Sequence, residues 1–219
     1  MSSVTRDSTH TLSRRYDTWS KFYDQTFKIL FTDRQRRAIN EMHLGSGDRV
    51  LDLGVGTGIT LPLYPAGVRV VGVDLSPGML REARRKNAAA LPADTHLVRA
   101  DALTPPFPDA SFDHVLMSHV ISVVSDPVRL LNVVARITRS GGRIVLISHF
   151  RSRRTPLAAV EKLLNPICLK LGWSSDINLP EILDRSDLQL AYQFKINPLD
   201  IWQIAVLMHR HPYPIARNT

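Results

Sequence analysis

The chain has 219 residues, 44% of them hydrophobic and 22% charged, which suits one globular domain with an ordinary core. Its net charge of +8 favours anionic partners such as nucleic acid, anionic lipid or an acidic small molecule. A single cysteine, Cys168, excludes an internal disulfide framework and a metal site made of cysteines alone, and no apolar run is long enough to cross a bilayer. The polar start lacks the apolar core of a signal peptide, so we expect a cytoplasmic protein.

Predicted helices and strands alternate along most of the chain. Residues 14–40 read as helix with a break near Thr32 and Asp33. Strands are then predicted at 49–55, 69–75, 95–100, 113–118 and 142–149, with helices at 77–90 and 129–137. This alternation predicts a parallel, doubly wound α/β sheet with helices on both faces.

The C-terminal part departs from that alternation. A mostly apolar stretch from Pro156 to Trp173 reads as a helix interrupted at Pro166, and two strands are predicted within 188–196 and 200–210. Two strands with a short link favour an antiparallel hairpin at one edge. We therefore predict a Rossmann-like sheet of seven strands whose last pair is antiparallel.

The stretch 50–58, VLDLGVGTG, places three glycines directly after the first predicted strand. A glycine-rich turn between a strand and a helix lets a ligand approach the backbone without Cβ atoms in the way. Amides at the start of the next helix can then meet a negative group. A dinucleotide fingerprint would need its third glycine where Ile59 stands, so the pattern here is a different one, G-x-G-x-G.

Acidic residues close the next two predicted strands. Asp74 is placed to accept hydrogen bonds from vicinal ribose hydroxyls, and Asp101 to accept one from an adenine amino group. Leu75 and Met79 could line the two faces of the base. Glycine turns and strand-end acids are common singly in α/β proteins, but their ordered succession predicts an adenosine-type ligand at the carboxyl ends of the strands.

Three motifs, VLDLGVGTG, VVGVDLS and RADAL, resemble the class I S-adenosylmethionine-dependent methyltransferases. The resemblance implies that the glycine loop wraps the methionine part of the cofactor, that the second-strand acid holds the ribose, and that the third-strand acid marks the adenine. An aspartate before the loop would support it, and the end of the fourth strand would line the methionine side. With the two base-lining residues, the expected cofactor site is Asp52, Gly54, Gly56, Gly58, Asp74, Leu75, Met79, Asp101, Ala102, Ser118 and His119. The reaction would yield S-adenosylhomocysteine and needs no metal.

Residues 14–31, RRYDTWSKFYDQTFKILF, read as an amphipathic helix with one aromatic face and a row of basic residues on another. It could pack on the core with a solvated, salt-bridged face. Alternatively it is a lid over the site whose basic and apolar parts also touch a membrane surface. We divide the chain into an N-terminal helical arm or lid, 1–40, and a methyltransferase domain, 41–219.

The stretch HFRSRR, residues 149–154, follows the fifth predicted strand. Strand ends face the site, so His149 could meet a methyl acceptor, while Arg151, Arg153 and Arg154 suit a phosphate. The apolar segment that follows would suit acyl chains if it is partly exposed. A solvated basic turn before an ordinary core helix is the alternative.

The N-terminal RRYDTWSKFYDQTF, together with GVGTGITLPLY and ISHF, resembles the soluble bacterial phosphatidylethanolamine N-methyltransferases over most of the chain. The resemblance implies methyl transfer to phosphatidylethanolamine, towards phosphatidylcholine, by an enzyme bound peripherally and reversibly to the anionic inner face of the cytoplasmic membrane. That family often has an asparagine where Ser148 stands.

For the acceptor side we expect two groups of residues. The catalytic candidates are Tyr16, Tyr23 and His149. The substrate-binding candidates are Trp19, whose ring could face a methylated ammonium, and the phosphate-binding Arg151, Arg153 and Arg154.

Three other functions stay open at this point. A ubiquinone- or menaquinone-type C-methyltransferase has a similar core and a lipid-like acceptor. A nucleic-acid methyltransferase would explain the charge, but an Asn-Pro-Pro-Tyr motif and a catalytic cysteine near the site are both missing, so we expect no nucleic-acid partner. A module that binds S-adenosylmethionine or lipid without transferring a methyl group is the non-enzymatic alternative.

Overall fold

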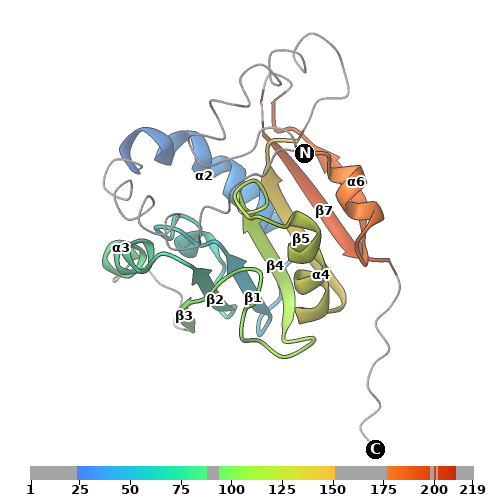
Figure 1. Ribbon diagram of the computed structural model, residues 1–219. Helices are drawn as coiled ribbons and strands as arrows, with labels where there is room; N and C mark the ends of the chain where they lie inside the picture. Colours follow the sequence, from blue (N-terminus) through green and yellow to red (C-terminus); the bar gives the residue numbers. More distant parts are fainter. Residues whose placement is uncertain (1–23, 88–93, 151–176, 198–199, 201, 211–219) are drawn as a thin grey trace, which may run out of the picture.

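The computed structural model describes residues 24–87, 94–150, 177–197, 200 and 202–210 (Figure 1). The strands in these segments are β1 (Arg49–Leu53), β2 (Arg69–Asp74), β3 (Thr95–Arg99), β4 (Phe112–Ser118), β5 (Thr138–Ser148), β6 (Leu188–Phe194) and β7 (Gln203–His209). The helices are α2 (Asp24–Asn40), the short 3-10 helix η1 (Leu61–Leu63), α3 (Pro77–Asn87), α4 (Pro127–Ile137) and α6 (Leu179–Asp184).

Within the described segments, seven strands form one sheet in the order β3-β2-β1-β4-β5-β7-β6. Strands β1 to β5 pair in parallel, while β7 runs antiparallel to both β5 and β6. The predicted α/β class, the parallel sheet and the terminal antiparallel hairpin are therefore confirmed. Strands β2 and β3 lie on one side of β1, and β4 and β5 lie on the other. The order therefore reverses between β1 and β4, which is where open α/β sheets bind ligands.

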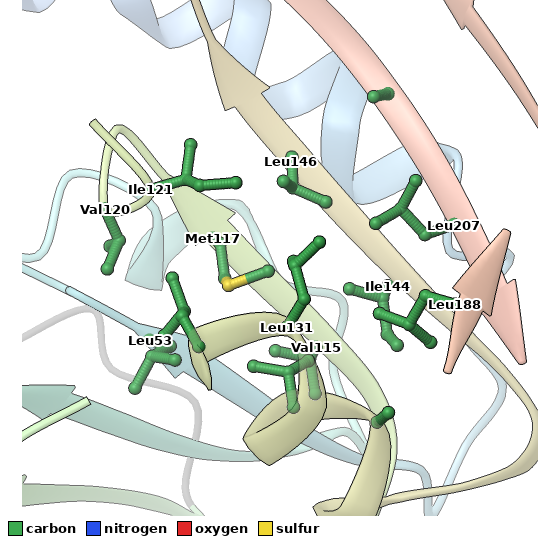
Figure 2. Close-up of a cluster of buried hydrophobic side chains, with 14 of the residues drawn as sticks. Leu53, Val115, Met117, Val120, Ile121, Leu131, Ile144, Leu146, Leu188 and Leu207 are labelled. Carbon is green, nitrogen blue, oxygen red and sulfur yellow. The ribbon is translucent and has the colours of Figure 1, made fainter. Parts of the chain in front are cut away.

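The strands in the middle of the sheet are buried on both faces, as their continuous apolar runs predict. Successive side chains of a strand point to opposite faces, so Val50 and Leu51 of β1 belong to different core clusters. Figure 2 shows Val115 and Met117 of β4 with Leu131 of α4 in the cluster on one face. On the opposite face, α2 and α3 supply the side chains that cover the sheet, among them Ala38, Ile39 and Ala83. The sheet therefore lies between two separate core clusters.

Register brings the ligand-facing loops together at that edge. Leu53, the last residue of β1, pairs with Val73 of β2 on one side and with Met117 of β4 on the other. The loops that follow these three strands therefore leave the sheet at one level. Helix α4 then begins at an N-cap, where the Asp126 carboxylate accepts a hydrogen bond from the Arg129 amide at 2.9 Å.

Three local expectations need correction. The predicted break near Thr32 and Asp33 is wrong, because α2 runs without interruption from Asp24 to Asn40. Strand β5 begins at Thr138 rather than at Gly142, since Thr138 pairs with Phe112 before an irregularity in β5, after which Arg143 pairs with His114. The short helix α6 was not predicted. It buries Leu179 and Leu183 against the core, and so few residues leave no periodic pattern to recognise.

The boundary between arm and domain stays a prediction. Helix α2 reaches Asn40, and its last two turns bury Gln35, Ala38 and Ile39. This part of the predicted arm therefore shares the core of the domain. The described part of the chain contains no helix long and apolar enough to cross a membrane.

Candidate active site

The glycine loop after β1 has a backbone conformation that residues with side chains rarely adopt. Gly54, Gly56 and Gly58 all have positive φ angles, +77°, +55° and +76°. A Cβ on Gly54 would lie 2.1 Å from Val120 Cγ2, and one on Gly58 would lie 2.7 Å from Asn87 Nδ2. At Gly56 the nearest atom would be 4.0 Å away, so this glycine faces open space. Two glycines thus let the loop pack on the protein, and the middle one leaves bare backbone for a ligand.

Asp74, at the end of β2, holds this loop in place. Its Oδ2 accepts a hydrogen bond from the Gly56 amide at 2.9 Å, and its Oδ1 accepts one from the Ser76 amide at 2.8 Å. The Gly54 amide also donates to the Val73 carbonyl at 2.7 Å. One half-buried carboxylate therefore joins the glycine loop to the segment that begins α3.

Asp52 supports the loop from below, within the core. It is fully buried, and its Oδ2 accepts hydrogen bonds from the Thr60 hydroxyl and, at 3.1 Å, from the Tyr64 hydroxyl. Its Oδ1 has no hydrogen-bond partner among the described residues. Burial raises the pKa of Asp52 from 3.8 to about 6, although both hydroxyls oppose the rise. Its charge is therefore sensitive to mildly acidic pH.

Asp101 lies beside Asp74 at the same edge. The Ala100 amide donates to the Asp74 carbonyl at 3.2 Å, which places the ends of β2 and β3 next to each other. The Asp101 Oδ1 accepts a hydrogen bond from the Leu103 amide at 2.9 Å. Leu75 is half-buried at the end of β2 and Met79 is buried in α3. We call the ends of β1, β2 and β3 with their loops the β1–β3 side of the site.

The ends of β4 and β5 present a second set of polar groups. Ser118 ends β4, and His119 follows with a φ of +62° while its amide donates to the Ile147 carbonyl at 2.8 Å. The hydroxyls of Ser118 and Ser148 are both buried without a hydrogen-bond partner in the described part of the chain. His149 follows β5 and is 9% exposed. Unpartnered buried hydroxyls at adjacent strand ends are typical of a site that a ligand completes.

A family model described as methyltransferase domain matches residues 51–146, the segment that holds the ends of β1 to β4. A phosphatidylethanolamine N-methyltransferase of Cereibacter sphaeroides is 39% identical over 85% of this chain and 92% of its own length. The chain belongs to the S-adenosylmethionine-dependent methyltransferases. The methyltransferase described here is also 31% identical to a demethylmenaquinone methyltransferase of Thermobifida fusca, over 85% of its own chain and 78% of that protein.

Solved structures confirm the fold of the methyltransferase. A SAM-dependent methyltransferase from Aquifex aeolicus matches it with a TM-score of 0.66 over 88% of this chain and 98% of that one. The two sequences are only 18% identical, so this likeness concerns the fold alone.

S-adenosylmethionine is the cofactor of the methyltransferase, and the residues on the β1–β3 side fit it. The open backbone at Gly56 leaves room beside the loop, and carboxylates at the ends of β2 and β3 are acceptors for ribose hydroxyls and an adenine amino group. The individual roles of the expected cofactor residues, including Leu75, Met79 and Ala102, stay predictions.

Three residues that no sequence pattern marks as a group, Arg34, Asp200 and Trp202, meet beside His119, and we call them the Arg34 cluster. The Arg34 guanidinium binds the Asp200 carboxylate in a bidentate ion pair with contacts of 2.8–2.9 Å, and the two side chains are only 11% and 7% exposed. The Arg34 Cζ also lies 4.7 Å from the centre of the Trp202 ring. Trp202 in turn meets His119 edge to face, with ring centres 6.1 Å apart. The cluster joins α2 to the segment before β7 at the edge where β4 ends.

The electrostatics of this cluster keep His119 neutral. Burial, and then the nearby Arg34 guanidinium, lower the pKa of His119 to about 4. A neutral imidazole can accept a hydrogen bond at one of its ring nitrogens. We call the ends of β4 and β5, the start of β7 and the Arg34 cluster the β4–β7 side of the site.

The remaining acceptor candidates lie outside the described residues. They are Tyr16, Trp19 and Tyr23 of the arm and Arg151, Arg153 and Arg154 after β5, together with the helix expected between Pro156 and Trp173. Their roles stay predictions. Within the described segments, no group of three His, Cys, Asp or Glu side chains could hold a metal ion.

Proposed function

We propose that the enzyme transfers methyl groups to the amine of phosphatidylethanolamine and of its monomethyl and dimethyl forms, towards phosphatidylcholine. The observation that carries the proposal is the 39% identity with a phosphatidylethanolamine N-methyltransferase over 92% of that relative's length. The demethylmenaquinone relative is less similar and is matched over 78% of its length. A protein of the cytoplasm that associates peripherally with the membrane would fit this acceptor.

The proposal assigns the cofactor to the β1–β3 side. Bound S-adenosylmethionine would supply an electrophilic methyl group on a positively charged sulfur. Gly56 would lie against its methionine part, Asp74 would accept from the ribose hydroxyls, and Asp101 would mark the adenine. Ser118 and His119 would line the side that faces the acceptor. Asp52 would not contact the cofactor but would stabilise the conformation of the glycine loop.

The acceptor amine would enter on the β4–β7 side. A primary amine has a pKa of roughly 10 in water, so it arrives mostly protonated and must lose a proton before it can react. Low exposure at His149 and at the Arg34 cluster points to a dry site, which disfavours the ammonium form. His149 or a water molecule would take the proton, and the neutral His119 could accept a hydrogen bond within the same side.

Positioning would supply most of the rate. Tyr16 and Tyr23 would hold the amine with its lone pair towards the methyl group, and Trp19 would face the head group once it is methylated. Arg151, Arg153 and Arg154 would bind the lipid phosphate. Orientation and exclusion of water can together lower a barrier by several kcal/mol without a strong base, on the order of 7 kcal/mol for well-aligned groups.

The deciding experiment is labelled-methyl transfer by the full chain to lipids dispersed in detergent, with products separated by head group. We expect label in methylated phosphatidylethanolamines. Tyr16→Phe and Tyr23→Phe should lower turnover more than they weaken binding of the methyl donor. Label only in a quinone, with none in phospholipid, would overturn the proposal.

A C-methyltransferase acting on demethylmenaquinone is the second candidate, favoured by the 31% identity with the Thermobifida fusca enzyme. The same assay with demethylmenaquinone in place of the phospholipid separates the two. The identity of the acceptor head group is therefore decided by one pair of parallel reactions.

A further inference from the structure

A groove of about 460 Å³ lies between α2 and the segment that ends β6, and the proposed function does not use it. We call it the α2–β6 groove. Its lining comes from one face of α2 and from the first residues of the loop between β6 and β7. The residues are Asp33, Arg36, Arg37, Asn40, Phe194, Lys195 and Ile196.

The groove is positively charged. Three of its residues are cations and one is a carboxylate. Arg36 and Lys195 are exposed and have no ion-pair partner among the described residues. Arg37 is held more tightly, because its Nε lies 2.9 Å from Glu41 Oε1 and its guanidinium lies 5.4 Å from the centre of the Phe194 ring. Two cations are therefore available to an anionic partner, and a third is held by Glu41.

Apolar side chains stand next to these cations. Within the described chain, the exposed large hydrophobic residues all lie on β6, on β7 or in the loop between them. Ile196 lines the groove and is 46% exposed, and Tyr192 is 41% exposed. The Tyr192 ring stacks on Phe194 and its hydroxyl donates to Glu41 Oε2 at 2.7 Å, so the ring is held in position. Basic and apolar side chains side by side are typical of surfaces that meet a membrane interface.

The groove adjoins the β4–β7 side of the site. Arg34 belongs to the same helix as Arg36 and Arg37 and contacts Asp200, which lies in the same loop as Lys195 and Ile196. The inner residues of these two segments thus form the Arg34 cluster beside His119, and their outer residues form the groove. A surface bound in the groove would lie next to the entry of the acceptor.

We propose that the α2–β6 groove docks the enzyme on an anionic phospholipid bilayer. Arg36 and Lys195 bind lipid phosphates, while Ile196 and Tyr192 enter the boundary between head groups and acyl chains. The inference rests on the proposed function, because a lipid acceptor explains why a docking surface adjoins the site. Arg36 and Arg37 belong to the arm of residues 1–40 that the sequence offered for membrane contact, and the groove adds Lys195 and Ile196 from the loop between β6 and β7. It does not include residues 14–31 or the arginines after β5, which the sequence offered for the same purpose.

The test measures cosedimentation of the full chain with vesicles of phosphatidylcholine alone or mixed with phosphatidylglycerol. The parent should bind only the mixed vesicles at low salt. Arg36→Glu with Lys195→Glu should weaken that binding by about tenfold or more, since each basic residue contributes to attraction at an anionic surface. The matched control is Arg84→Glu with Arg185→Glu, two exposed arginines on α3 and after α6 that change the net charge by the same amount. The control should stay within about twofold of the parent.

A second variant, Ile196→Asp, tests the apolar contact. At every salt concentration at which the parent binds the mixed vesicles, this variant should bind less, because salt screens charges and does not weaken apolar burial. Calorimetric titration with S-adenosylmethionine shows whether each variant is folded.

Equal loss in the groove variant and its control would overturn the proposal, as would a parent that binds neither kind of vesicle. Light scattering that shows dimers in the parent and monomers in Ile196→Asp would assign the groove to a second copy instead. Methyl transfer to detergent-dispersed lipid is independent of vesicle binding, so failure of the proposed function is seen separately.

Discussion

On the β1–β3 side the interacting residues are close in sequence, whereas on the β4–β7 side they come from opposite ends of the chain. Gly56 and Asp74, which form the central hydrogen bond of the first side, are 18 positions apart. Arg34 and Asp200, which form the central ion pair of the second, are 166 positions apart. A side built from one local strand–loop–strand unit can be kept while the other side changes. Relatives named for an ethanolamine lipid and for a quinone both match 85% of the chain, so a shared fold does not by itself fix the acceptor.

The largest effect is expected from Gly54→Ala on the β1–β3 side. The new Cβ would have to occupy a left-handed conformation and would lie 2.1 Å from Val120 Cγ2, so we expect a loss of about 2–5 kcal/mol in the free energy of unfolding and no measurable binding of S-adenosylmethionine. Gly47→Ala is the control, since its φ is +91° but nothing lies within 4 Å. It should lose only about 1 kcal/mol and keep cofactor binding. Chemical denaturation and calorimetry measure both, and equal losses in the two variants would contradict the expected clash.

Breaking the Arg34 cluster should lower the free energy of unfolding and weaken binding of the acceptor, without changing the affinity for the cofactor. Asp200→Asn leaves the nearly buried Arg34 guanidinium without its carboxylate, so we expect a loss of about 3 kcal/mol in the free energy of unfolding. The KM for the lipid should rise while the Kd for S-adenosylmethionine stays within about twofold of the parent. Arg34→Gln combined with Asp200→Asn removes the uncompensated charge and should recover part of the stability. A cofactor Kd that rose as much as the lipid KM would show that the two sides are not independent.

Asp74→Asn should have the opposite effect, weakening cofactor binding while leaving acceptor binding nearly unchanged. An amide oxygen is a weaker acceptor than a carboxylate, so the Gly56 hydrogen bond weakens and we expect the Kd for S-adenosylmethionine to rise about 10- to 100-fold. The lipid KM, measured at saturating cofactor, should change little. Asp113→Asn is the matched control, because that carboxylate accepts a hydrogen bond from the Arg49 amide at 2.8 Å at the start of β1, away from the carboxyl edge. Equal weakening by both variants would remove Asp74 from the cofactor site.

The smallest effect concerns the pH dependence that Asp52 imposes from beneath the loop. Because burial raises its pKa to about 6, the folded chain binds more protons than the unfolded chain between about pH 4 and pH 6. The contribution of Asp52 to stability therefore falls as the pH rises through that window and is constant above it. Between about pH 5 and pH 8 the loss should be about 1 kcal/mol. Asp52→Asn should show no such contribution in denaturation curves, and an unchanged pH profile in that variant would contradict the raised pKa.

The sequence by itself determined the α/β class, the antiparallel last pair and most of the strands, whereas their order came from the structure. Apolar runs such as RVLDL and RVVGVD are buried on both faces, and that burial requires parallel neighbours and crossover helices. The positions of the glycine loop and of Asp74 and Asp101 at adjacent strand ends follow from the same short stretch of chain, because parallel strands end at one edge.

Tertiary structure alone decided the rest. Arg34 and Asp200 carry no local signal, since a helix arginine and a loop aspartate look like any solvated pair until the hairpin of β6 and β7 brings them together. Continuity of α2 across Thr32 and Asp33, the short helix α6 and the α2–β6 groove depend likewise on packing between distant segments. Local hydrogen bonds and side-chain periodicity are encoded over a few residues, whereas burial of a charge or exposure of an apolar side chain depends on which distant segment lies opposite.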